Sequence, residues 1–170
     1  RAREARPDLG ARQKVVLAKI IQVGEDIYVD SICERTVLGL YNRKAREAAM
    51  REMGRVLDGS AVSLDRLMFL WWSRSWGERT EAEEDYQEAL EILEGLTTEL
   101  RAVMESSGGG VERCGRRLSL YLEAHEGIWG IVSSWKILDP MVPALFLGVG
   151  TQFASGAGDG GKTDAGPEAV

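Results

Sequence analysis

Residues 80–104 read TEAEEDYQEALEILEGLTTELRAVM, and this stretch decides the fold class. Thr80 followed by Glu83 is a capping box, in which both side chains satisfy backbone N–H groups at a helix start. Apolar residues then recur at steps of three and four, a spacing typical of one amphipathic helix: Tyr86, Ala89, Leu90, Leu93, Leu96, Leu100, Val103 and Met104. Serines and glycines at 106–110 end the helix. We expect the rest of the chain to pack around it.

The first third of the chain predicts two helices. Apolar residues at helical spacing indicate the first: Val16, Ile20, Val23 and Ile27. Residues 19–32 are also rich in β-branched side chains, so a β-hairpin remains an alternative there. Ser31 with Glu34 forms a second capping box, which favours a new helix from Ile32 to Leu57. The apolar face of this second helix would include Val37, Leu38 and Tyr41.

Residues 67–72 read LMFLWW and are apolar on nearly every side of a helix, so this third helix should be the most buried element. Ser60 or Ser63 would cap its start, and Gly77 would end it. The few residues between Gly77 and Thr80 predict an antiparallel hairpin with the acidic helix.

A fifth helix is expected over residues 111–132, and Asp139-Pro140 should open a short last helix. From Ala154 onward glycine, alanine and polar residues predominate, which predicts a flexible tail. The expected fold is therefore all-α: an up-and-down bundle of four to six helices, with one domain over residues 1–153 and a tail over 154–170.

Charge is distributed unevenly along the 170 residues, which carry a net charge of −6. Residues 1–57 hold 12 basic and 8 acidic side chains (+4), residues 58–110 hold 4 and 12 (−8), and residues 111–170 hold 5 and 7 (−2). We expect basic helices to lie beside the acidic one, with Arg113, Arg116 and Arg117 facing Glu99 and Glu105. The negative balance argues against a dedicated nucleic-acid binder, and Glu47 and Glu52 interrupt the basic stripe of Lys44, Arg51 and Arg55.

The chain begins with arginine, so it is either a processed form or a piece of a longer protein. Its first residues contain no apolar run of the kind that a secretory signal needs, which favours an intracellular or organellar location. Cys33 and Cys114 form no CxxC pattern, so we expect buried thiols without a disulfide or a zinc site.

Three patterns could carry chemistry, and each has a simpler explanation. Gly156, Gly161, Lys162 and Thr163 match the phosphate-binding pattern GxxxxGK[ST], but no buried strand precedes the loop and no helix can follow it. His125 is the only histidine and lies on an apolar face, as a hydrogen-bonded core histidine would. A ladder of carboxylates on one helix face is typical of a solvated surface: Glu81, Glu84, Glu88 and Glu91. We therefore expect no metal, no cofactor and no enzymatic activity.

The tryptophans and the apolar segment near the C-terminus are the remaining candidates for function. We expect core or interface roles for Trp71, Trp72, Trp76, Trp129 and Trp135, and an interface role for Leu145 and Phe146. Residues 127–153 hold more apolar surface than one bundle edge covers. The leading interpretation is a non-catalytic subunit or adaptor that binds other protein subunits. A peripheral membrane bundle using residues 127–153 and a fragment of a nucleotide-binding protein are the alternatives.

Overall fold

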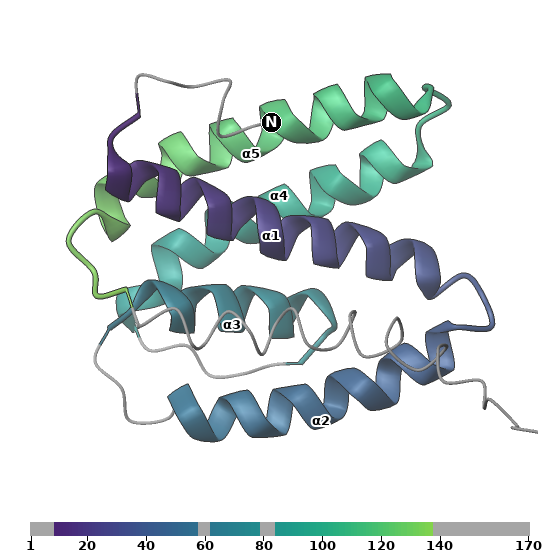
Figure 1. The fold of residues 1–170 in the computed structure, drawn as a ribbon, viewed down its shortest axis with the longest axis horizontal. Coiled ribbons are helices and arrows are strands. Elements are labelled where there is room, and N and C mark those ends of the chain that lie inside the picture. The colour runs from purple at the N-terminus through teal and green to yellow at the C-terminus, as the bar shows by residue number, and fades with distance from the viewer. Residues whose placement is uncertain (1–8, 58–61, 79–83, 138–170) are drawn as a thin grey trace, which may run out of the picture.

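The structure is a computed structural model that describes residues 9–57, 62–78 and 84–137 (Figure 1). Its elements are α1 (Ala11–Cys33), α2 (Gly39–Leu57), α3 (Leu64–Ser75), a short 3-10 helix η1 (Glu84–Tyr86), α4 (Gln87–Glu105) and α5 (Gly110–Val132). These described ranges contain no β-strand, and one isolated parallel bridge joins Ser63 to Lys136. The prediction of an all-α helical bundle is confirmed. The capping box at Thr80 and Glu83, the expected last helix and the tail lie outside the described residues.

Helix α1 is continuous through the region where a hairpin remained an alternative, so the helical prediction is correct there. The prediction of a second capping box at Ser31 and Glu34 is wrong, because Ser31 lies inside α1. Its hydroxyl donates to the carbonyl oxygen of Ile27 at 2.7 Å, one turn back in the same helix. The chain turns only after Cys33, and α2 begins at Gly39 rather than at Ile32.

Helix α1, not α4, is the element that contacts every other helix. In Figure 1 it crosses the middle of the bundle, with α5 on one side, α3 and α2 on the other, and α4 crossing behind it. The residues that α1 buries recur at helical spacing: Val16, Leu17, Ile20, Val23, Gly24 and Ile27. Because α1 is apolar over much of its circumference, it supplies the centre of the core.

Helices α3 and α4 run parallel, so the predicted antiparallel hairpin is wrong. The backbone N–H of Ser63 donates to the hydroxyl of Tyr86 at 3.0 Å, and Trp71 Nε1–H donates to Thr97 Oγ1 at 2.8 Å. Arg101 then donates to the carbonyl oxygen of Ser75 at 2.7 Å. Partners advance together along both helices, as they do only when two helices point the same way.

Helix α3 is the most uniformly buried helix, as its sequence predicts. Ser63 caps its start and accepts a hydrogen bond from the backbone N–H of Arg66. Trp71 is fully buried, and Trp72 is 5% exposed. The helix ends at Ser75, and Gly77 follows with a φ of +82°, a left-handed conformation that glycine adopts without steric cost.

Helices α1 and α5 pack antiparallel around a partly buried polar cluster. Arg117 donates to both carboxylate oxygens of Glu25, at 2.7 and 3.1 Å, and Tyr121 donates to the same carboxylate at 2.8 Å. A side chain at Gly24 would collide with the Tyr121 ring, so the glycine permits this close approach. The hydrogen bond to Glu25 raises the pKa of Arg117, and burial raises that of Tyr121.

Basic side chains do lie beside carboxylates, as predicted, but the predicted partners are wrong. Arg117 faces Glu25 of α1 rather than Glu99 or Glu105, and Glu105 pairs with Arg35 at 2.8 Å. Basic α2 packs against α1 and α3 in the described residues, not beside acidic α4. The sequence alone does not distinguish the predicted pairing from the observed one, because both place basic helices next to carboxylates.

Candidate functional site

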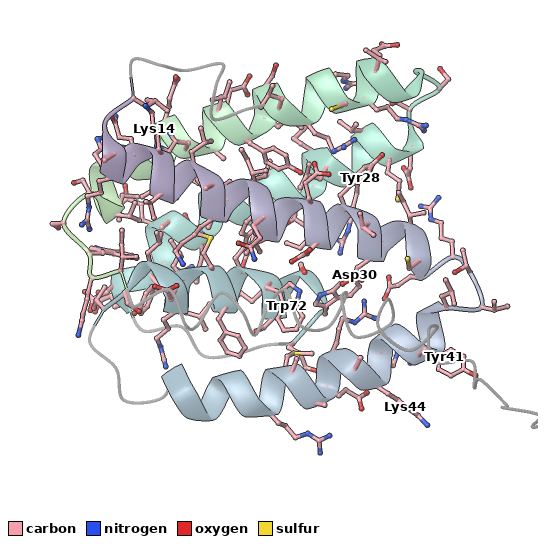
Figure 2. The ribbon with its side chains drawn as sticks, in the orientation of Figure 1. Lys14, Tyr28, Asp30, Tyr41, Lys44 and Trp72 are labelled. Atoms are coloured by element: carbon pink, nitrogen blue, oxygen red, sulfur yellow. The ribbon has the colours of Figure 1, made fainter. Side chains whose placement is uncertain are left out.

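Exposed apolar side chains gather at the corner between α1 and α2. We call this set the corner patch: Val29 (51% exposed), Ile32 (42%), Val37 (84%), Leu38 (55%) and Tyr41 (70%). The sequence places the last three on the buried face of a helix, and that prediction is wrong. Val37 and Leu38 belong to the turn, and Tyr41 projects from the first turn of α2, away from the rest of the bundle (Figure 2).

The turn that presents the corner patch is held by a compact set of hydrogen bonds. The Thr36 hydroxyl donates to the carbonyl oxygen of Cys33 at 2.7 Å and accepts from the backbone N–H of Leu38 at 3.2 Å. Gly39 N–H donates to the Thr36 carbonyl oxygen at 3.1 Å. A Cβ at Gly39 would lie 3.0 Å from Glu34 Cα, so only glycine fits this approach without movement of backbone. The corner patch therefore rests on a defined scaffold.

Ion pairs made by two arginines, Arg35 and Arg46, connect this corner to the bundle. Arg35 reaches Glu105 at the end of α4, with both side chains largely exposed. Arg46 of α2 is 4% exposed, lies 3.5 Å above the Trp76 ring, and approaches Asp30 and Glu34 of α1 at 3.7 and 3.5 Å. A buried guanidinium stacked on an aromatic ring keeps its charge while shielding that ring from water. Arg46 thus links α1, α2 and the end of α3.

Charges of both signs surround the corner patch. The exposed basic side chains are Arg35, Arg43 and Lys44, and the exposed acidic ones are Glu34, Glu47 and Glu105. Arg46 lies on the same helix as the basic stripe, but it is buried and adds nothing to that surface. The patch is therefore apolar at its centre and mixed in charge around its edge.

A carboxyl with a raised pKa lies on α1 one turn before Asp30. Burial, together with the nearby carboxylates of Asp30 and Glu25, raises the pKa of Asp26 to about 6. Burial also raises the pKa of Asp30, although Arg46 opposes that shift. Asp26 thus retains its proton in the folded chain at a pH where the unfolded chain has lost it.

This shift predicts a pH-dependent stability. Between about pH 4 and 6 the folded state binds more protons at Asp26 than the unfolded state does, so its contribution to stability falls as pH rises. The Asp26→Asn variant has no carboxyl at this position, so its stability should not fall in this way. The urea midpoint of the variant should exceed that of the wild-type chain, and the difference should grow from pH 4 to pH 7. Glu123→Gln, which removes an exposed carboxylate on α5, is the control. A constant margin for Asp26→Asn over this pH range would contradict the prediction.

The tryptophans predicted as core or interface residues divide into two groups. Trp71 and Trp72 are buried and present no surface to a partner in this fold. Trp76, Trp129 and Trp135 are half-buried against the core. An interface role for these three stays a prediction, and Leu145 and Phe146 lie outside the described residues.

The other predicted sites lie in the core, on the surface or outside the described residues. His125 is buried and stacks on Trp129 with ring centroids 5.9 Å apart, so its expected place in the core is confirmed. Cys33 is half-buried and Cys114 exposed, so the prediction of a buried thiol is wrong for Cys114. The phosphate-loop match at Gly156, Gly161, Lys162 and Thr163 lies outside the described residues.

The apolar segment over residues 127–153 is only partly described. Its first part, Gly127–Val132, belongs to α5, where Ile128 and Val132 are buried in the core. The docking or membrane role expected for residues 127–153 stays a prediction, because residues 138–153 lie outside the description. In the described ranges no helix has the length and apolar character needed to span a bilayer. Those ranges also contain no group of three or more His, Cys, Asp or Glu side chains placed to hold a metal ion.

Comparison with known proteins gives no relative. No family model, no curated protein and no solved structure matches the chain. The functional argument therefore depends on the corner patch and its surroundings.

Proposed function

We propose that this protein is a non-catalytic helical subunit or adaptor of a larger protein assembly, and that it binds its assembly through the corner patch. The observation that carries the proposal is the exposure of five large apolar side chains on one corner. Scattered apolar residues are normal on protein surfaces, whereas adjacent ones are typical of interaction sites. Exposed aromatic residues, here Tyr41, are enriched at protein interfaces.

The rigidity of the corner supports the same proposal. Binding costs conformational entropy when loops must become ordered, and a surface already fixed avoids much of that cost. Thr36 and Gly39 fix the turn, while the Arg35–Glu105 pair connects it to α4. Val37 and Leu38 are thus presented outward by a short turn between two helices.

The test compares two exposed apolar residues of which only one belongs to the corner patch. Leu38→Asp should fold normally and lose the proteins that cross-link to the wild-type chain in its native source. Val111→Asp is the matched control, because Val111 is 91% exposed at the start of α5 and does not belong to the corner patch. Cross-linked proteins identified by mass spectrometry should be retained by this control. The same set of proteins on Leu38→Asp as on wild type would contradict the proposal.

A further inference from the structure

Helix α2 is attached to the bundle differently from the other helices. Helices α1, α3, α4 and α5 each bury several large apolar or aromatic side chains in the core. Among the α2 side chains that the structure describes, Arg46 alone is buried, while Ala49 and Met50 contact the core and stay partly exposed. Burial of apolar surface is the main force that holds a helix in a bundle, and the described part of α2 supplies little of it.

The contacts of Arg46 are incomplete for a buried cation. Its Nη1 lies 3.7 Å from Asp30 and its Nη2 lies 3.5 Å from Glu34, whereas arginine pairs elsewhere in the described residues have distances of 2.7 and 2.8 Å. The buried Nη1 makes no hydrogen bond to any described residue. Burial raises the pKa of Asp30, and Arg46 opposes this shift only in part. Because a buried charge needs close and complete pairing, these ion pairs favour the docked position of α2 only weakly.

Separation of α2 returns the Arg46 cluster, which we define as Arg46, Asp30, Glu34 and Trp76, to water. The guanidinium and both carboxylates then recover their hydration, which offsets the loss of two long ion pairs. The guanidinium lies 3.5 Å from the centre of the Trp76 ring, so separation also exposes this ring, and that exposure opposes it. The docked form should therefore be the major one, with the separated form as a minor state.

The position of α2 allows it to separate without disturbing the rest of the bundle. In Figure 1 it forms one edge of the bundle, and its main contacts are with α1 and α3. The turn before α2 keeps its own hydrogen bonds, because the Thr36 hydroxyl bonds within the turn, to Cys33 and Leu38. Elements with few buried apolar contacts are the ones that open locally in folded proteins.

We propose that α2 separates from α1 and α3 as a unit while the other helices stay folded, and that the Arg46 cluster controls this separation. The motion divides the corner patch, since Tyr41 lies on α2 whereas Val29 and Ile32 lie on α1. A chain with α2 docked presents the whole patch, and a chain with α2 separated no longer presents its five residues together. The regulation of the corner patch by this motion rests on the proposed function, whereas the motion itself does not.

Native-state hydrogen exchange of the full chain, followed by mass spectrometry of its peptides, measures this separation. Backbone amides of α2 should exchange at least about tenfold faster than the most protected amides of α1 and α4, because their exchange needs only the local opening. Exchange of α2 as slow as that of α1 and α4 would overturn the inference, since α2 would then open only together with the whole bundle.

A variant of Arg46 tests the role of the Arg46 cluster. Arg46→Met keeps an unbranched side chain and removes the charge, so it leaves Asp30 and Glu34 without the guanidinium. Exchange in α2 should rise about tenfold or more over the wild-type chain, with that of α4 and α5 unchanged. Arg51→Met is the matched control on the same helix, because Arg51 is exposed and its Nε donates to the carbonyl oxygen of Glu47. This control should exchange as the wild-type chain does.

The variant can contradict the inference in two ways. Unchanged or slower exchange of α2 in Arg46→Met would overturn the role of the Arg46 cluster. Faster exchange in every helix, or loss of the folded state by circular dichroism, would show that α2 is not a separate unit and would overturn the inference as a whole.

These outcomes are distinguishable from those of the proposed function, because exchange is measured on the isolated chain. A slowly exchanging α2, together with loss of cross-linked proteins on Leu38→Asp, overturns the separation and supports the adaptor. A rapidly exchanging α2 that responds to Arg46→Met, together with unchanged cross-linked proteins on Leu38→Asp, supports the separation and contradicts the corner patch as the binding site.

Discussion

Trp71→Ala should lower the free energy of unfolding by about 3–5 kcal/mol, as truncation of a buried aromatic ring does elsewhere. Trp71 is fully buried at the centre of α3, and its indole N–H donates to Thr97 on α4. The substitution therefore creates a cavity between two parallel helices and removes a hydrogen bond across them. Urea denaturation followed by circular dichroism measures the change.

Two further variants divide this loss between packing and hydrogen bonding. Trp71→Phe keeps an apolar ring and removes the N–H, so it should cost less than Trp71→Ala. Thr97→Val removes the acceptor, together with the bond that Thr97 itself donates to Leu93. It leaves a buried indole N–H unpaired, which costs about 1–3 kcal/mol. A loss below about 1 kcal/mol for Trp71→Ala would place the ring at the surface and contradict the structure.

The burial of α3 could be predicted from the sequence because it follows from the composition of the helix itself. A helix that is apolar on every side has no face to offer to water, wherever the other helices lie. The direction of α3 relative to α4 could not be predicted in the same way. Gly77 and Thr80 are close in sequence, which suggested a tight reversal, but the hydrogen bonds between α3 and α4 show that the two helices point the same way. The length of a connection restricts the relative direction of the two helices that it joins but does not determine it.

The position of the α1–α2 turn shows how a local signal fails. Ser31 and Glu34 have the spacing of a capping box, yet a serine inside a helix can bond to the carbonyl one turn back, as Ser31 does with Ile27. Three residues of the corner patch, Val37, Leu38 and Tyr41, were consequently assigned to a buried face. The signals for the real turn were Thr36 and Gly39, whose roles depend on contacts with Cys33 and Glu34.

The second large effect is expected at a buried ion pair between α1 and α3. Lys19 Nζ contacts Asp65, whose carboxylate is 2% exposed in the first turn of α3. Lys19→Met keeps much of the side-chain volume but removes the ammonium that pairs with the buried carboxylate of Asp65. The free energy of unfolding at pH 7 should fall by about 3–5 kcal/mol, because breaking a buried ion pair on one side leaves the desolvation cost of the other charge poorly offset.

Replacing both partners should be far less damaging than replacing one. Lys19→Met combined with Asp65→Leu leaves apolar side chains where the pair was, and such replacements are often neutral or stabilising. The double variant should therefore recover most of the stability that Lys19→Met loses. Arg35→Met is the control, because it breaks the exposed pair with Glu105 and should cost only about 0–1 kcal/mol. A similarly small loss for Lys19→Met would show that water reaches Asp65, and the tight contact between α1 and α3 would then be wrong.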